Sequence, residues 1–538
     1  MKRIPNKKAA VCLVILGLVS LMFFSGSFAE ENDQAPGRSM ADQATKGVEH
    51  WSTTDHSKFP ALDREFDSGT EITEACLSCH TEAEAQIHKT IHWTWLSPYD
   101  VDGTLGKAGY SINNFCVSAN KMKDTECTHC HVGWKAKEDG INCLLCHSQK
   151  DIKWRDEFAD YHFFKEMGDK EIADEIQTKI RDGAKSIGLP GRTNCGNCHF
   201  YGGGGEAVKH GDLDASLVNP MKTLDVHMAI DGQNFRCTRC HTTVFHRIAG
   251  RVYSTPAVTH RKSLVESDLV PKIMCESCHT ATPHKKGHKA NDHTDRVACQ
   301  SCHIPKFARA HATMMWWDWS TAGKLKDGKP YREKGEWDRP TYKSIKGSFK
   351  WDKDVTPEYF WYNGSLSTIT AKDVIDPTRP VWLSKPAGSR DDPNSRIFPF
   401  KVHRGNTPYD KVNNTMLTML ESEEVDGFWK TFDWQDAMQK GMAIMGLPYS
   451  GEIGFVKTNY VYPTTHMVAP KENVVDCIEC HRGNNSRLAS LTGFYMPGRD
   501  HFKFLDILGW LGVLAAAGGI SLHAAGRYIA GITRRKEK

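Results

Sequence analysis

The sequence predicts a mainly α-helical chain with extensive loops, which ends in one C-terminal transmembrane helix. Three observations support this fold class. The motif Cys-X-X-Cys-His occurs eight times in 538 residues. Hydrophobic residues make up only 39% of the chain, so something other than aliphatic side chains must fill much of the core. Near the C-terminus, residues 507–525 form a long, almost uniformly apolar run.

The eight motifs indicate covalently bound c-type haem. The two thiols of this motif form thioether bonds to the haem vinyl groups, and the adjacent His binds the iron. Random placement of 18 Cys and 26 His would give only about 0.03 matches, and neither disulfides nor zinc sites need a His after each second Cys. We therefore expect a multihaem cytochrome c fold wrapped around eight covalently bound haems. The attachment residues are Cys76, Cys79, Cys127, Cys130, Cys143, Cys146, Cys195, Cys198, Cys237, Cys240, Cys275, Cys278, Cys299, Cys302, Cys477 and Cys480, and the proximal iron ligands are His80, His131, His147, His199, His241, His279, His303 and His481.

Residues 1–29 have the pattern of a secretory signal peptide. A basic segment precedes an apolar run at residues 9–24, and small residues precede a predicted cleavage site after Ala29. Export fits covalent haem attachment, which we expect outside the cytoplasm. Residues 30–70 are polar and show little apolar periodicity, so we expect a flexible or surface-draped leader there.

Seven motifs lie in a predicted seven-haem region at residues 71–303. Each haem has only about 33 residues to itself, which is too few for a conventional two-layer domain. We therefore expect short helices and loops that wrap around the haems. The clearest predicted helix covers residues 169–187, where Ile172, Ile176 and Ile180 form one apolar stripe.

Residues 304–503 combine a long stretch without attachment sites, residues 304–476, with the eighth motif. Clusters of aromatic residues, Gly and Pro favour a covering segment that packs on the haems and excludes water. A direct catalytic role is the alternative. A second helical pattern covers residues 433–445.

The apolar run at residues 507–525 predicts a transmembrane anchor over residues 504–532. Its 19 residues span about 28 Å as a helix, which matches a bilayer core of roughly 30 Å. The basic tail at residues 533–538 then lies in the cytoplasm, and the haem region lies at the periplasmic face of the inner membrane. His523 and Arg527 lie four residues apart on this helix and suggest contact with a membrane cytochrome b or quinol-oxidising module. Snorkelling of both side chains to the interface is the alternative.

The chain has more His residues than its motifs use. Eight of the 26 His belong to the motifs, and 18 remain as candidates for the second axial position of each iron. Around several of them the sequence resembles the octahaem c-type cytochromes of the tetrathionate reductase family, from about residue 70 to residue 490. The stretches that carry this resemblance are QIHKTIHWTW, RTNCGNCHFYGGGGEAVKHGDLD, LDVHMAIDGQNFRCTRC, WWDWSTAG and GLPYSGEIGFVKTNYVYPTTHMVAPKENVVDC.

This resemblance implies that seven haems have two His ligands, and that a lysine amine replaces the distal His at the haem of the second motif. The implied lysine is Lys153, with Lys150 as the second choice. The amine must be neutral to bind iron, and the metal itself supplies the drop from a free pKa of about 10.4. The implied distal ligands are His92, His210, His227, His246, His284, His293 and His466, with His88, His260, His288 and His311 as substitutes.

Two functions remain open. The resemblance implies an oxidoreductase that reduces a small sulfur or nitrogen oxyanion or related compound, with tetrathionate, nitrite and hydroxylamine as candidates. Lys153 would then vacate the distal site and His131 would set the electron density of the iron. The alternative is a non-catalytic electron-transfer subunit between a membrane cytochrome b and soluble periplasmic acceptors. The net charge of +4 gives no reason to expect nucleic acid as a partner.

Overall fold

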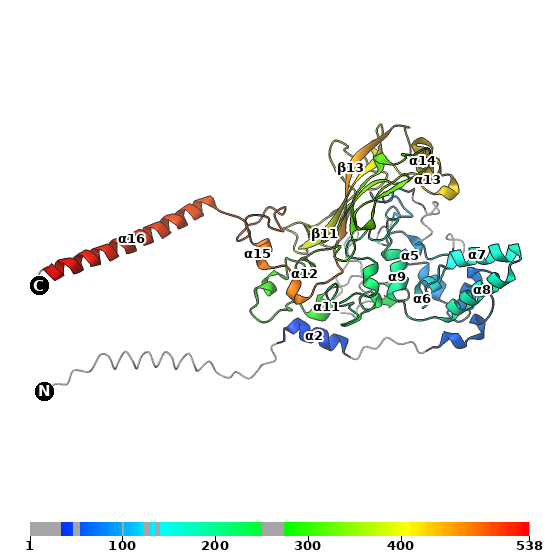
Figure 1. Cartoon of the computed structure of the whole chain (residues 1–538), viewed down its shortest axis with the longest axis horizontal. Helices are drawn as coiled ribbons and strands as arrows, with labels where there is room; N and C mark the ends of the chain where they lie inside the picture. The colour runs from blue at the N-terminus through cyan, green and yellow to red at the C-terminus, as the bar shows by residue number, and fades with distance from the viewer. Residues whose placement is uncertain are drawn as a thin grey trace. The chain divides into compact units, whose positions relative to one another are not determined.

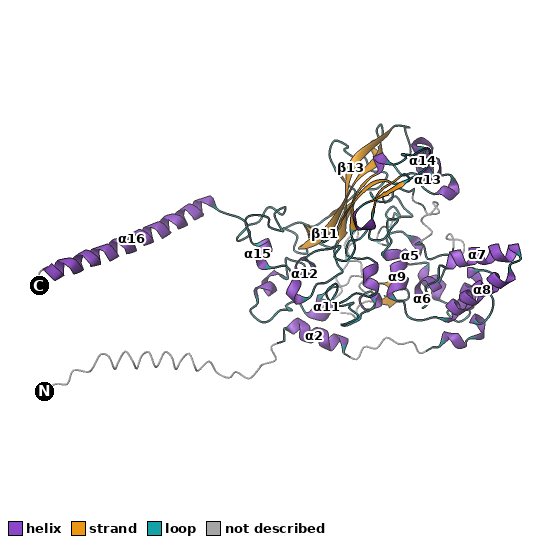
Figure 2. Cartoon of the chain, viewed as in Figure 1, coloured by secondary structure: helices purple, strands orange, loops and turns teal. Residues whose placement is uncertain are grey.

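The computed structural model describes most of the chain (Figures 1 and 2). The described residues are 34–46, 54–98, 100, 102–119, 121, 130–134, 140–249 and 274–536. The predicted signal peptide, Cys127 and His260 lie outside them. The packing divides the chain into two units: residues 34–46 belong with Cys275–Thr294, and the rest of the described chain forms the larger unit.

The smaller unit contains helix α2 (Pro36–Thr45), helix α11 (Glu276–His279) and the 3-10 helix η7 (Lys289–His293). The N–H of Gly37 donates to the carbonyl oxygen of Pro283 at 3.0 Å. A Cβ atom at position 37 would lie 2.5 Å from Cβ of Pro283, so this close approach requires glycine. The leader that the sequence predicts as flexible therefore contains a helix that packs beside the sixth motif. The sequence does not reveal this contact because the partner segment is distant along the chain.

Helices dominate the part of the larger unit that precedes residue 304. Helix α8 (Lys170–Lys185) confirms the helix predicted at residues 169–187, and the side chain of Asp169 caps it by accepting the N–H of Ile172. Its buried face includes Ile180 and Ala173, whereas Ile172 is exposed. The other elements here are α3 (Gly69–Leu77), α4 (Ala83–Ile87), α5 (Ile91–Thr94), α6 (Leu144–His147), α7 (Trp154–Met167), α9 (Arg192–His199), α10 (Cys237–Cys240), α12 (Cys299–His303), and strands β1 (Thr243–Val244) and β2 (Arg247–Ile248).

The segment without attachment sites forms a nine-stranded sheet, so the prediction of a mainly α-helical fold is wrong for this part of the chain. The order β4-β5-β6-β3-β11-β13-β9 is completed by β7 and β12, which pair with β11. The two longest strands pair antiparallel, from Phe400 opposite Pro463 to Asp410 opposite Ile453. The strands are β3 (Thr313–Asp318), β4 (Arg332–Lys334), β5 (Pro340–Lys343), β6 (Gly347–Asp352), β7 (Glu358–Tyr362), β9 (Val381–Trp382), β11 (Arg396–Asp410), β12 (Thr415–Met416) and β13 (Ile453–Pro463), and β8 (Leu366–Thr368) pairs separately with β10 (Ser384–Pro386).

The central strand β11 lacks the sequence pattern of a strand. Residues 397–403 are all buried, so hydrophobic and polar residues do not alternate along it. It also contains Pro399 and Pro408, which usually argue against a strand. These two features explain why the sheet is not apparent from the sequence.

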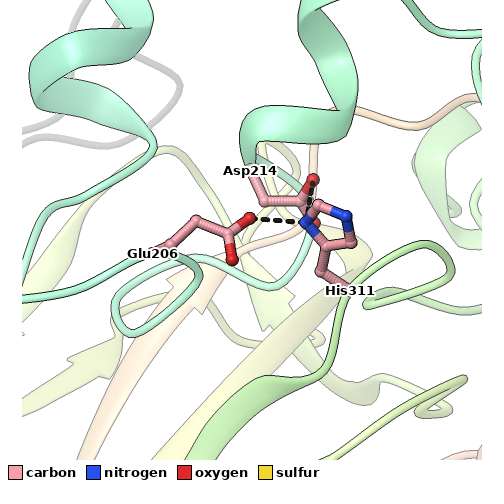
Figure 3. Close-up of side chains that lie close together, drawn as sticks. All are labelled: Glu206, Asp214 and His311. Carbon is pink, nitrogen blue, oxygen red and sulfur yellow. Dashed lines mark hydrogen bonds and ion pairs between the residues drawn. The ribbon is translucent and has the colours of Figure 1, made fainter. Parts of the chain in front are cut away.

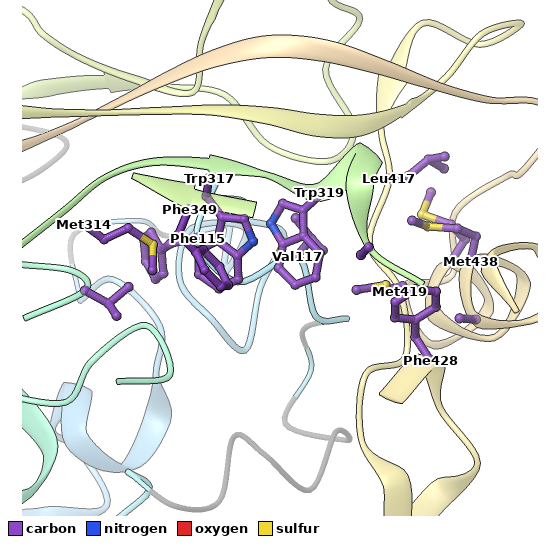
Figure 4. Close-up of a cluster of buried hydrophobic side chains, with 14 of the residues drawn as sticks. Phe115, Val117, Met314, Trp317, Trp319, Phe349, Leu417, Met419, Phe428 and Met438 are labelled. Carbon is purple, nitrogen blue, oxygen red and sulfur yellow. The ribbon is translucent and has the colours of Figure 1, made fainter. Parts of the chain in front are cut away.

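An aromatic and Met-rich core packs against this sheet (Figure 4). Trp317 and Trp319, from the WWDWSTAG stretch, stack with ring centres 4.7 Å apart. Helix α14 (Trp434–Met445) contributes Met438 and confirms the helix predicted at residues 433–445. Short helix α13 (Phe428–Thr431) adds Phe428. This segment thus packs around a hydrophobic core, which it shares with Phe115, Val117 and Val208, and does not depend on haem alone for its packing.

Helix α16 (Lys503–Lys536) contains the predicted anchor (Figure 1). It is 34 residues long and buries none of its side chains among the described residues. Its length and apolar composition are sufficient to cross a bilayer. An apolar helix with all sides exposed also needs an apolar environment, and both features agree with the predicted membrane span.

Candidate haem-binding sites

Seven of the eight motifs are fully described, and each forms about one turn of helix. The first motif begins at the end of α3, and the fourth forms the second half of α9. The others form or include α6, α10, α11, α12 and α15 (Cys477–Cys480). In the first motif the N–H of His80 donates to the carbonyl oxygen of Cys76 at 2.9 Å. This bond places the first Cys, second Cys and His at helical positions i, i+3 and i+4, which share one face. The two thiols and the imidazole can therefore reach the same haem.

Three motif His residues lie opposite a second His at the separation that one metal ion requires. Two imidazole nitrogens bound to one ion each lie roughly 2 Å from it, so their ring centres lie about 6 Å apart. The observed separations of the ring centres are 6.2, 6.2 and 6.3 Å. The pairs are His80 with His56, His199 with His92, and His241 with His466.

The His199 pair is also in the protonation state that iron binding requires. Burial lowers the pKa of His199 to about 3, and the neighbouring His92 contributes to this shift. Burial likewise lowers the pKa of His92. Both imidazoles are therefore neutral at physiological pH, with a nitrogen lone pair available for a metal.

Many of the candidate ligands use Nδ1 for a hydrogen bond, which leaves Nε2 to face a metal. Nδ1 of His147 contacts the carbonyl oxygen of Gly188 at 3.1 Å, and Nδ1 of His246 contacts Oε1 of Gln86 at 2.9 Å. The same arrangement, with Nδ1 bonded to a carbonyl or side-chain oxygen, is found at His241, His279, His284, His293 and His481.

A carboxylate orients His466. Its Nδ1 lies 3.4 Å from Oδ2 of the buried Asp212, which also accepts the N–H of His466 at 2.9 Å and that of Thr465 at 2.6 Å. Burial opposes ionisation of Asp212, but its hydrogen bond with His466, the charges of His466 and His210 and the N–H of Thr465 together outweigh burial, and the pKa falls to about 2. A carboxylate bonded to Nδ1 directs Nε2 toward a metal and raises its basicity.

The second motif has different surroundings. His131 is fully buried, its Nε2 donates to the carbonyl oxygen of Trp93 at 2.9 Å, and its Nδ1 accepts the N–H of Gly133 at 3.3 Å. Binding of iron through Nε2 therefore requires the contact with Trp93 to open. Arg155 donates to the carbonyl oxygens of Gly133 at 2.8 Å and Trp134 at 2.5 Å, just after His131 in the chain.

Two cations lie close to the second motif. The pKa of Cys130 is lowered to about 7, first by its hydrogen bond with the thiol of Cys198. The positive charges of Lys209 and Arg155 lower this pKa further, although burial raises it. Both cations therefore lie near enough to act on the electrostatics of this motif.

A buried lysine holds the loop that carries Lys209. The ammonium of Lys401 on β11 donates to the carbonyl oxygen of Val208 at 2.8 Å, to that of Lys209 at 3.1 Å and to Oγ1 of Thr313 at 2.7 Å. All three ammonium protons thus have an acceptor. No sequence pattern marks Lys401, because its hydrogen-bond acceptors lie far away along the chain.

Lys401→Met is expected to remove a pH-dependent contribution to stability. Burial lowers the pKa of Lys401 well below 10.5. Between the folded-state pKa and 10.5 the unfolded chain binds one more proton, so the free energy of unfolding rises with pH in that window. In the variant this rise should be absent, and the unpaired buried oxygens should cost about 1–3 kcal/mol. Denaturant unfolding at several pH values measures both effects, with Lys457→Met, an exposed lysine on β13, as the control. An unchanged pH slope in Lys401→Met would contradict the argument.

Comparisons with known proteins identify the family. A family model described as bacterial cytochrome c matches residues 314–484. An uncharacterized protein from Archaeoglobus fulgidus is 23% identical over 301 residues, which make up 46% of this chain and 92% of that protein. The crystal structure of an octahaem cytochrome c from Shewanella oneidensis matches with a TM-score of 0.66 and 37% identity, over 80% of this chain and 94% of that chain. The chain belongs to the octahaem cytochromes c.

As a member of this family, the protein is a multihaem cytochrome c whose cofactor is c-type haem with iron. The helical turns that present two thiols and one imidazole, and the His pairs about 6 Å apart, fit this cofactor. The family match at residues 314–484 covers most of the sheet. The segment without attachment sites is therefore part of the cytochrome and not an unrelated domain.

Thiols from different motifs lie next to one another in this octahaem cytochrome. Thiols of three pairs of motifs lie close enough for each to shift the pKa of the other: Cys76 and Cys143 of the first and third motifs, Cys130 and Cys198 of the second and fourth, and Cys195 and Cys237 of the fourth and fifth. The fourth motif thus has the second and the fifth as direct neighbours. Neighbours in space are therefore not simply neighbours in sequence.

The structure places the remaining predicted ligands in several environments. His210 is partly buried, with its ring 5.1 Å from that of Tyr462. The ring of His227 stacks on Phe235 at 6.3 Å. His284 and His293 lie in the smaller unit with the sixth motif. Lys153 is the N-cap residue of α7, and both it and Lys150 are exposed. The roles of all these His and Lys residues as iron ligands stay predictions.

His56 is a candidate ligand that sequence analysis does not include. It lies in the 3-10 helix η1 (His56–Lys58), within the predicted leader, and none of the stretches that carry the family resemblance contains it. Its ring lies 6.2 Å from that of His80. The only sequence signal for it is the surplus of His outside the motifs.

Proposed function

We propose that this protein is a membrane-anchored periplasmic cytochrome that carries eight haems and reduces a small sulfur or nitrogen oxyanion or related compound at the haem of the second motif. Tetrathionate, nitrite and hydroxylamine are the candidate substrates. Bound haem supplies one-electron chemistry and, where its distal side is open, a position for a small molecule. His131 is the proximal ligand of this haem, and Lys153 is the distal ligand that gives way to substrate.

The observation that carries the proposal is the pair of cations beside the second motif. Arg155 is held in place by its bonds to main-chain carbonyl groups, and Lys209 belongs to a loop held by Lys401. Both charges act on Cys130, so both lie near the haem attached there. Fixed cations attract an anionic substrate and stabilise negative charge that develops on it.

The start of α7 also favours a role for Lys153. Arg155, two residues further along, donates to the carbonyl groups of His131 and Gly133, so this end of the helix lies beside the second motif. The exposed side chain of Lys153 makes no hydrogen bond or ion pair within the described residues. Its movement toward or away from the iron therefore breaks no existing polar contact.

A second candidate function is favoured by α16. A helix that can cross a membrane and buries nothing among the described residues suits an anchored electron-transfer subunit. Its partners would be a membrane cytochrome b or quinol-oxidising module and a soluble periplasmic acceptor. His523 and Arg527 on this helix are the residues that such a membrane partner would contact.

Addition of external ligands to the holoprotein distinguishes the two functions. Under the reductase proposal, cyanide, nitrite or hydroxylamine should change the optical and EPR signals of one haem and leave the bis-His haems unaltered. The titration is done in both the oxidised and the reduced protein, because the distal lysine can be bound more firmly in one state. If every haem signal stays unchanged in both states, the protein is an electron-transfer subunit without a substrate site.

A further inference from the structure

Glu206, Asp214 and His311 form a polar cluster outside the haem motifs (Figure 3). Nδ1 of His311 lies 2.5 Å from Oε1 of Glu206 and 3.7 Å from Oδ1 of Asp214. One potential ligand atom from each side chain lies within 4.8 Å of the other two. Figure 3 shows that the three side chains point toward one another from separate parts of the chain.

The buried carboxylate of Asp214 is only half satisfied. This side chain has no exposed surface, and its Oδ1 accepts the N–H of Ser216 at 2.9 Å and the hydroxyl of Ser216 at 2.5 Å. Oδ2 is also buried and has no hydrogen-bond partner among the described residues. Burial raises the pKa of Asp214. A buried carboxylate oxygen without a donor is costly, and a cation in the cluster would remove that cost.

The cluster is accessible from solvent. An open pocket of about 310 Å³ lies beside it, lined in part by Glu206, His311, Trp337 and Lys353. Arg339 also lines this pocket, and its guanidinium donates to Oε2 of Glu206 at 2.5 Å. Oε1 is thus left directed at His311. The pocket provides both an entry path and room for water molecules on the open side of a bound ion.

We propose that Glu206, Asp214 and His311 form a binding site for a divalent transition-metal cation such as Zn²⁺. Two carboxylate oxygens and one imidazole nitrogen suit such an ion, and water in the pocket completes the coordination. Ligands of one tetrahedral ion lie roughly 3–3.5 Å apart, so Glu206 and His311 must separate slightly when the ion binds.

The ion would connect two segments that follow haem motifs. Glu206 and Asp214 lie after the fourth motif, and Asp214 caps the 3-10 helix η5 (Ala215–Val218). His311 lies between the seventh motif and β3. Because the unfolded chain does not hold these side chains together, binding to the folded state should stabilise it. The predicted role is a cross-link that joins the loop after the fourth motif to the sheet.

The site is tested by calorimetric titration with Zn²⁺ of the holoprotein, which keeps its haems but is depleted of other metal ions. One Zn²⁺ should bind per chain, and Glu206→Gln and His311→Gln should each weaken it by at least about tenfold. The matched control is His501→Gln, which removes an exposed His whose Nδ1 lies 3.6 Å from Oδ2 of Asp506. Equal binding in His311→Gln and His501→Gln would overturn the proposal. The melting temperature should rise with Zn²⁺ in the wild type and in the control, but not in the two cluster variants.

Arg339→Gln should increase the affinity for Zn²⁺, whereas the variants above should decrease it. Removal of this positive charge frees Oε2 of Glu206 and lowers the repulsion of a cation, so Zn²⁺ should bind several-fold more tightly. A cluster with a purely structural role would lose an ion pair and gain no affinity, so unchanged or weaker binding would count against the site.

The haem spectrum separates this proposal from a role of His311 as a distal iron ligand. His311→Gln should leave the low-spin haem signals as they are in the wild type. A change in those signals would assign His311 to a haem and overturn the metal site. Zinc K-edge absorption should show imidazole nitrogen and carboxylate oxygen in the ion's coordination.

Discussion

Lys153→His is expected to abolish reduction of tetrathionate, nitrite and hydroxylamine by the holoprotein, with haem content unchanged. A primary amine binds iron only after it loses a proton, and it is readily displaced as protons compete for it. An imidazole at this position is neutral at physiological pH and would close the distal side. The loss should appear in kcat and not only in KM. The measurement is turnover with a reduced viologen dye as electron donor, for each substrate in turn.

Lys150→His is the matched control, because Lys150 is also exposed and lies three residues before Lys153. This variant should retain activity and its response to cyanide. If Lys150→His is inactive and Lys153→His is active, Lys150 is the distal ligand. Full activity in both variants would remove either lysine from the reaction.

Removal of the fourth motif, by Cys195→Ala and Cys198→Ala, is expected to cut the supply of electrons to the second motif. The thiols of the second and the fifth motifs lie near enough to those of the fourth to raise their pKa, and Cys146 of the third motif also raises it. We therefore expect the haem attached to the fourth motif to be a junction for electron transfer. The variant should lack one haem per chain by mass and show near-complete loss of substrate reduction. In rapid-mixing experiments with dithionite, the haem attached to the second motif should be reduced more slowly than in the wild type.

Removal of the eighth motif, by Cys477→Ala and Cys480→Ala, is the control for this experiment. It also takes one haem from the chain, but the thiol of another motif that Cys480 affects is Cys302 of the seventh, whose pKa it helps to raise. With a soluble dye as donor, this variant should keep most of its activity. Circular dichroism and haem content show whether each variant is folded. Equal activity of the two variants would mean that the fourth motif is not a junction.

The secondary structure that sequence reasoning finds is the part that local interactions decide. The helices at α8 and α14 have an Asp cap and an apolar face, and both features lie within one short stretch of chain. The sheet around β11 depends on a partner strand some fifty residues away and on burial of both faces. Neither condition leaves an alternating pattern, so a long β-structure in a chain of short helices is not apparent.

The candidate iron ligands also divide into those that a sequence motif indicates and those that only the structure reveals. Sequence motifs indicate His92 and His466, and the structure brings them opposite His199 and His241. His56 has no such motif, and only its position opposite His80 reveals it. Lys401 and the three residues of the cation cluster are likewise visible only through their neighbours.

The sequence by itself determined the attachment chemistry, because two thiols and an imidazole within five residues share one helical turn whatever the rest of the chain does. It also contains the apolar C-terminal run, and it predicts a signal for export. Only the tertiary structure decided which thiols are neighbours, which His face each other, and how the sheet carries Lys401 to the loop of Lys209. These contacts join residues that are distant in sequence, and their geometry depends on the packing of the whole chain and not on any local pattern.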